Sequence, residues 1–150
     1  MSQTDHESEY EETEPRRDVH IDSGQYDMFT ELQESEDSPF YQAENHDLFV
    51  FAVGYGRQKA MPQSTKNDEH AFFGRSRLSD TQQTVLEAVA VYEDRSVHVL
   101  RDQRRVYEIA EEYANAGVEE LYGRVFGPED DPLSELTLEL KEFYEDEVSR

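Results

Sequence analysis

The chain of 150 residues contains no cysteine and no tryptophan, only 3 lysines, and no apolar run long enough to cross a membrane. Without cysteine, the protein can have no disulfide framework, no thiol nucleophile and no Cys-ligated zinc or iron–sulfur cluster. A membrane helix needs about 18 consecutive apolar residues, and the first thirty residues lack the apolar segment of a signal peptide. We therefore expect a cytoplasmic protein with no membrane partner.

Positive charge is also scarce. The chain has 36 acidic and 14 basic residues, which gives a formal net charge of −22. Such a field repels DNA phosphate over most of the surface and excludes a generic polycationic nucleic-acid binder. Abundant carboxylates with few lysines are typical of a haloarchaeal-type, salt-adapted cytoplasm. In molar salt the Debye length falls to about 3 Å, so the repulsion between carboxylates is screened.

Apolar residues are distributed unevenly along the chain. Of the 32 Leu, Ile, Val and Phe residues, residues 1–39 hold only four. A segment with little apolar surface and high charge cannot bury enough area to fold. The sequence therefore predicts a disordered acidic N-terminal tail over residues 1–26 and a single helical domain over residues 27–150.

The spacing of apolar residues in the domain predicts a mainly α fold, with about five helices and at most a short two-stranded β element. Helices are expected over residues 27–33, 45–56, 79–92, 102–126 and 131–143. Short extended segments are expected near residues 72–78 and 97–100. The central positions of the apolar stripes predict a shared core that contains Val89, Ile109, Tyr113 and Leu121.

Three local signals place the helix ends. Ser79 followed by Gln82 is a capping-box pattern and predicts a helix start. Asp102 is a candidate N-cap for the next helix. Gly117 is expected to end or kink that helix, because glycine is a poor helix former.

No residue pattern in the sequence indicates catalysis. The five histidines are scattered without metal-ligand spacing. Gly54 and Gly56 resemble the start of a phosphate loop, but the Gly-Lys-Ser/Thr end is missing. No nucleophile with a partner base can be singled out. We therefore expect no enzymatic activity, no cofactor, no metal and no small-molecule substrate.

The one anomaly is a basic island. Residues 48–78 carry five basic and two acidic residues, a net charge of +3 inside a chain of −22. The candidate DNA- or partner-contacting residues are Arg57, Lys59, Arg75 and Arg77, with Phe72 and Phe73 between them. One interpretation is contact with nucleic-acid phosphate, with the aromatic rings available for stacking. The other is internal neutralisation by carboxylates of neighbouring helices.

Three segments, in order, resemble a known family. They are residues 47–59, the alanine- and valine-rich residues 85–92, and residues 108–121, which include the sequence Glu-Tyr-Ala-Asn-Ala-Gly at 112–117. The chain is similar over residues 28–126 to the Dnd-system-associated protein 4 family, which is encoded beside genes for DNA phosphorothioation. The acidic tail and the last predicted helix lie outside this resemblance. The family offers no catalytic residues that could be carried over.

The resemblance implies a non-enzymatic accessory role in phosphorothioation-dependent antiviral defence. The implied partners are other proteins of that system, and DNA through the basic island. An acidic adaptor or regulatory protein unrelated to DNA modification is the alternative. A nuclease component is a third interpretation, although the sequence shows no carboxylate–lysine site for it.

Overall fold

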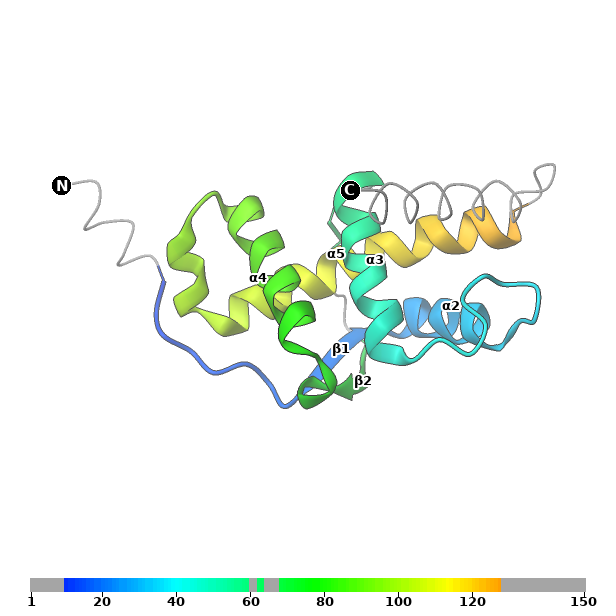
Figure 1. The fold of residues 1–150 in the computed structure, drawn as a ribbon, viewed down its shortest axis with the longest axis horizontal. Coiled ribbons are helices and arrows are strands. Elements are labelled where there is room, and N and C mark those ends of the chain that lie inside the picture. Colours follow the sequence, from blue (N-terminus) through cyan, green and yellow to red (C-terminus); the bar gives the residue numbers. More distant parts are fainter. Residues whose placement is uncertain (1–9, 60–61, 64–67, 128–150) are drawn as a thin grey trace.

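The computed structural model describes residues 10–59, 62–63 and 68–127. In chain order the elements are β1 (Asp18–Asp22), α2 (Ser23–Glu34), α3 (Asn45–Lys59), β2 (Glu69–Gly74), the 3₁₀ turn η1 (Arg75–Arg77), α4 (Asp80–Asp94), the 3₁₀ turn η2 (Val97–Arg101) and α5 (Gln103–Phe126). The fold is mainly helical with one two-stranded antiparallel sheet, as predicted (Figure 1). No helix within the described residues has both the length and the hydrophobicity needed to span a bilayer.

Helix α5 is the centre of the molecule. It runs through the middle of Figure 1 and is contacted by α2, α3, α4 and β1. Three of the four residues predicted to form the core, Ile109, Tyr113 and Leu121, are buried, and the fourth, Val89, packs against that core from a partly buried position. The wide apolar face of α5 therefore organises the other elements around it.

Gly117 does not end α5, so this part of the prediction is wrong. The helix continues through Gly117 to Phe126. Gly117 lies at the point where α5 crosses α3. A Cβ at Gly117 would come within 2.0 Å of the Ala52 carbonyl oxygen, and one at Gly56 within 2.3 Å of the Tyr113 carbonyl oxygen. The glycines let the two backbones touch, so Gly117 serves tertiary packing rather than helix termination.

The predicted boundary of the acidic tail at residue 26 is wrong, since β1 occupies Asp18–Asp22 and α2 begins at Ser23. Val19 and Ile21 alternate with polar residues and are buried, which gives the strand its apolar face. The same observation corrects the predicted helix start at residue 27. Residues 1–9 of the predicted tail, and the helix predicted over 131–143, lie outside the described residues.

The ladder between β1 and β2 contains a bulge. Val19 pairs with Phe73 and His20 pairs with Ala71, so Phe72 is the extra residue. A bulge interrupts the alternation of side chains between the two faces of a strand, so neighbouring side chains can point to the same side. Both Phe72 and Phe73 therefore pack inward, Phe72 with its ring centroid 4.7 Å from that of Phe29, and Phe73 5.3 Å from that of Phe49.

Helix α4 starts as predicted, with the complete capping box of Ser79 and Gln82. The spacing of its apolar residues predicts a buried face of Val85, Ala88, Val89 and Tyr92, widened by Leu86 and Ala90. In the structure Leu86 and Ala90 are the buried residues, whereas Val85 and Tyr92 are 37% and 60% exposed. The helix is rotated by about one residue position, roughly 100°, relative to the stripe predicted from its spacing.

Asp102 caps α5 as predicted, accepting from the Arg105 amide. The segment before it is not extended as predicted but forms η2. The Ser96 side chain accepts from the His98 amide, and among the described residues neither β1 nor β2 pairs with this segment. A side chain that bonds the backbone two residues on favours such a turn over an extended segment.

Candidate functional site

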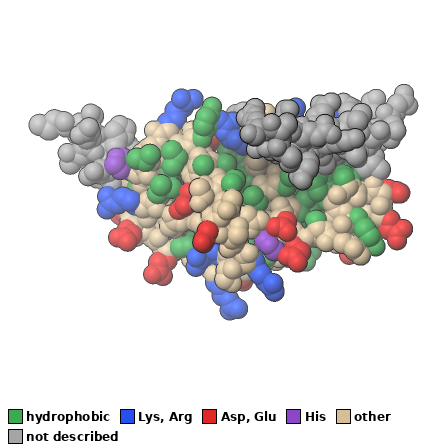
Figure 2. Space-filling model, viewed as in Figure 1, with side chains coloured by type: hydrophobic (Ala, Val, Ile, Leu, Met, Phe, Trp, Pro, Cys, Tyr) green, Lys and Arg blue, Asp and Glu red, His purple; other side chains and the backbone are tan. Residues whose placement is uncertain are grey.

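Arginines gather at one end of the β ladder. Arg17 directly precedes β1, and Arg75 directly follows β2. Because the strands are antiparallel, with Asp18 opposite Gly74, the residue before one strand faces the residue after the other. The Arg75 amide donates to the Arg17 carbonyl at 2.9 Å. Lys and Arg side chains accordingly gather at the lower edge of the molecule in Figure 2, below the β ladder of Figure 1.

We call this group of three residues, Arg17, Arg75 and Arg77, the arginine patch. It surrounds a hollow of about 360 Å³ that is lined by Arg17, Asp18, Gly74, Arg75, Ser76 and Arg77. All three arginines are exposed, and none forms an ion pair with a carboxylate among the described residues. Among the described residues, Asp18 is the one acidic residue that lines the hollow. The patch therefore presents guanidinium groups that are open to an external anion.

Arg75 is held in place by neutral groups. Its Nε donates to the Arg16 carbonyl at 3.2 Å. Arg75 also lies close enough to Tyr107 to act on that tyrosine's pKa: burial raises the pKa, and the positive charge of Arg75 opposes the rise. None of these partners is a carboxylate, so the orientation of the Arg75 guanidinium is restricted without an opposite charge beside it.

The residues of the predicted basic island do not form one surface. Arg75 and Arg77 lie near the start of α3, where Asn45 donates to the Phe72 carbonyl at 2.9 Å. Arg57 and Lys59 lie at the other end of this helix, whose 15 residues span about 20 Å. The remaining basic residue of the island, Lys66, lies outside the described residues.

Arg57 is engaged within the chain. Its guanidinium carbon lies 3.7 Å from the centroid of the Tyr92 ring, a cation–π contact between α3 and α4. Lys59 is exposed. Phe72 and Phe73, proposed above as stacking residues, are committed to the core contacts described with the bulge, so neither ring is available to a nucleic-acid base.

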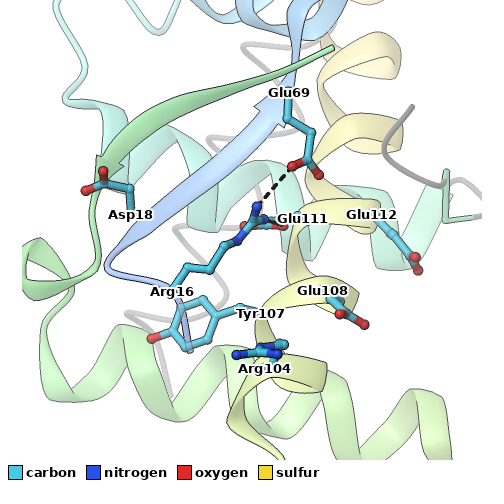
Figure 3. Close-up of a pocket in the computed structure, with 8 residues that line it drawn as sticks. All are labelled: Arg16, Asp18, Glu69, Arg104, Tyr107, Glu108, Glu111 and Glu112. Carbon is cyan, nitrogen blue, oxygen red and sulfur yellow. Dashed lines mark hydrogen bonds and ion pairs between the residues drawn. The ribbon is translucent and has the colours of Figure 1, made fainter. Parts of the chain in front are cut away.

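A second site lies between the β ladder and α5. Figure 3 shows the Arg16 guanidinium directed at Glu69 and Glu111, with Nη1 to Glu69 Oε2 and Nη2 to Glu111 Oε1 both at 3.0 Å. The second oxygen of Glu111 accepts from the His20 amide at 2.8 Å. The surrounding cleft measures about 440 Å³ and is lined by Arg16, Asp18, Glu69, Arg104, Tyr107, Glu108, Glu111 and Glu112.

Glu111 is 2% exposed, and burial raises its pKa to about 7, against the opposing effects of the His20 amide and of Arg16. Both of its oxygens have partners, so the carboxylate anchors the chain leading into β1. One turn later Asn115 accepts from the Asp22 amide at 3.3 Å. Side chains of α5 thus accept hydrogen bonds from backbone N–H groups of β1 on the edge that does not pair with β2.

Comparison with known proteins adds a family assignment. A family model described as DNA sulphur modification system-associated protein 4 matches residues 18–150. The chain belongs to this family. No curated protein and no solved structure matches it.

The family match begins at the first residue of β1, in agreement with the finding that this strand is part of the fold. It also extends beyond the predicted limits of 28–126 in both directions. The statement that the last predicted helix lies outside the resemblance is therefore wrong, since the match includes residues 127–150.

One group in this family member has the composition of a metal site. Glu44, His46 and Asp47, at the start of α3, place ligand atoms within 4.8 Å of one another. His46 Nδ1 lies 3.5 Å from Glu44 and Nε2 lies 3.4 Å from Asp47, so both ring nitrogens already face a carboxylate. Acidic residues are common at helix N-termini for electrostatic reasons, and we assign no metal here.

Sequence reasoning missed Arg16, Arg17 and Glu111. The first two were placed in the predicted tail, although the alternation of Val19 and Ile21 with polar residues could have indicated a strand that starts next to Arg17. Glu111 was not singled out among the many acidic residues. The polar residues Glu111, Asn115 and Glu119 recur every four positions within the apolar pattern of α5, and this was the available signal for a polar contact row.

Proposed function

We propose that this protein is a non-enzymatic accessory component of a DNA phosphorothioation-dependent antiviral defence system. The observation that carries the proposal is the family match over residues 18–150, whose description names the DNA sulphur modification system. Association with that system is the established part. The defence role, the contact-based mechanism and the absence of catalysis are proposed.

The arrangement of the surface supports a mechanism based on contacts. The arginine patch offers oriented guanidinium groups to an oxyanion, whether a DNA phosphate or a partner carboxylate. Outside the hollow of the arginine patch, α4 and η2 expose large apolar side chains, namely Val85, Tyr92, Val97 and Leu100. Apolar area of this kind supplies most of the affinity in protein contacts, whereas exposed charges mainly set orientation.

The test uses the native host. A strain that lacks this gene is compared with the wild type by virus plating, and a tagged copy of the full chain is purified under native salt to identify its bound proteins. We expect fewer cells to survive infection in the deletion strain, and we expect proteins of the sulphur-modification system to co-purify. Unchanged protection together with unrelated partners would contradict the proposal.

A second candidate function is an acidic adaptor unrelated to DNA modification, which the net charge of −22 favours. It predicts that co-purified partners carry basic surfaces and that virus plating does not depend on the gene. The same pair of measurements therefore separates the two functions.

A further inference from the structure

The arginine patch is constructed by the sheet rather than by a run of basic sequence. Arg17 and Arg75 are 58 positions apart, yet the antiparallel ladder places them side by side, and η1 adds Arg77 two residues later. Arg75 is restrained by the Arg16 carbonyl, which reduces the entropy lost when the guanidinium binds an anion. The position of this patch is therefore fixed by the fold.

The patch arginines differ from Arg16 and Arg105, which form ion pairs with carboxylates. Arg16 pairs with Glu69 and Glu111, and Arg105 pairs with Asp94 at 2.9 Å. The three patch arginines lack such a carboxylate partner within the part of the chain that the structure describes, and only Asp18 shares their hollow. In a chain with 36 carboxylates, uncompensated guanidinium groups point to an anion that is supplied by a partner.

The composition of the patch favours phosphate over a protein carboxylate surface. The large exposed apolar side chains of the described residues are Tyr26, Tyr41, Val85, Tyr92, Val97, Leu100 and Phe126. None of them lines the hollow. Protein interfaces normally have an apolar core, whereas phosphate is bound by arginine together with hydroxyl groups, and here the hydroxyl is that of Ser76.

The same composition favours a duplex over a single strand. Single-stranded nucleic acid is bound by aromatic rings on which the bases stack, but Phe72 and Phe73 are packed inward, as described above. A duplex needs only backbone contacts. We propose that Arg17, Arg75 and Arg77 bind the phosphate backbone of double-stranded DNA. This inference rests on the proposed function and names the partner of its arginine patch.

The expected binding is weak and depends strongly on salt. Three phosphate contacts give a slope of log K against log salt concentration near −3, and the net charge of −22 opposes association over the rest of the surface. The patch therefore orients the protein on DNA that the complex already holds. It reads no sequence, because phosphate contacts carry none directly.

The experiment measures the fluorescence anisotropy of a short labelled DNA duplex with the full chain. KCl is lowered stepwise to the least concentration at which circular dichroism shows the native fold. The patch variant combines Arg17→Gln, Arg75→Gln and Arg77→Gln. The control variant combines Arg95→Gln, Arg101→Gln and Arg104→Gln, three exposed arginines outside the patch, and has the same net charge.

We expect the patch variant to lose at least about tenfold in affinity and most of its salt slope, while the control stays within about threefold of wild type. Asp18→Asn should raise the affinity a few-fold by removing the one negative charge from the hollow. Equal loss in both triple variants, or binding of polyglutamate to the patch in place of the duplex, would overturn the inference.

The two proposals can fail separately. If wild-type protein binds no duplex under any native condition, but the deletion strain loses protection, the inference is wrong and the proposed function stands. If the patch-dependent duplex binding is measured but deletion leaves protection unchanged, the inference stands as a property of the molecule and the proposed function is wrong.

Discussion

At the scale of single residues, Glu111 shows how one buried charge organises the entry to the fold. Its carboxylate joins the Arg16 guanidinium and the His20 amide, two groups that lie on either side of the start of β1. Removing a carboxylate from water disfavours its charged form, which is why burial raises the pKa of Glu111 to about 7. The same group therefore links the stability of this region to pH.

We predict that Glu111→Gln flattens the pH dependence of stability. The pKa of Glu111 is about 7 in the folded state and about 4.5 in the unfolded chain, so between these values the folded state binds more protons. The free energy of unfolding of the wild type therefore falls as pH rises from about 5 to about 8, by on the order of 3 kcal/mol from this group alone. The glutamine variant lacks this contribution. Denaturant unfolding across this pH range, in molar KCl, measures the difference.

The matched control for this prediction is Glu108→Gln, which removes an exposed carboxylate from the preceding turn of the same helix. Its free energy of unfolding should follow the pH profile of the wild type. Apart from positions 108 and 111, the wild type and the two variants have the same titrating groups. The difference between their pH profiles therefore isolates the contribution of position 111. If the Glu111→Gln profile ran parallel to that of the wild type, Glu111 would not titrate with a raised pKa.

At the scale of elements, the crossing of α3 and α5 depends on two glycines. Gly56 and Gly117 bring the backbones so close that no side chain fits between the helices, whereas a Cβ at Gly123, two turns further along α5, would meet nothing within 4 Å. The same glycine-to-alanine change at these two positions of α5 therefore separates the effect of helix propensity from the effect of helix packing.

We predict opposite effects for Gly117→Ala and Gly123→Ala. The first forces the helices apart and should lower the free energy of unfolding by about 1–3 kcal/mol or more. The second should raise it by about 0.5–1 kcal/mol, because alanine is a better helix former than glycine. Thermal unfolding of both variants in molar KCl is the measurement. Two stabilised variants would show that the helices do not touch at Gly117.

Elements were predictable from the sequence where local chemistry specifies them. The capping box at Ser79 and the N-cap at Asp102 mark helix starts, because the groups they satisfy lie within three residues. The strand β1 was missed because its hydrogen-bonding partner, β2, lies about 50 positions away. For the same reason Arg17 was not grouped with Arg75 and Arg77, which lie beside it, and Arg57 was grouped with residues that lie at the other end of α3.

At the scale of the whole molecule, the net charge of −22 affects both folding and binding. Molar salt screens the repulsion between carboxylates and stabilises the compact state. It would also weaken the proposed contact between the arginine patch and DNA, because counterion release contributes less free energy at high salt. If molar salt is needed for folding, the same condition limits the proposed affinity for DNA. Stable residence on DNA would then come from partner proteins, in agreement with an accessory role.

The last prediction concerns the balance between carboxylate repulsion and its screening by salt during folding. We expect the protein to lose helical structure in dilute buffer and to regain it as KCl approaches molar concentration, because the excess negative charges repel one another over tens of ångströms at low ionic strength. Far-UV circular dichroism during a KCl titration follows the transition. Sucrose is the control, since it favours apolar burial by exclusion from the surface but does not screen charge. KCl should restore the helical signal at lower osmolality than sucrose does. A helical signal that is the same in dilute buffer and in molar KCl would show that the core contacts around α5 outweigh the charge repulsion without help from salt.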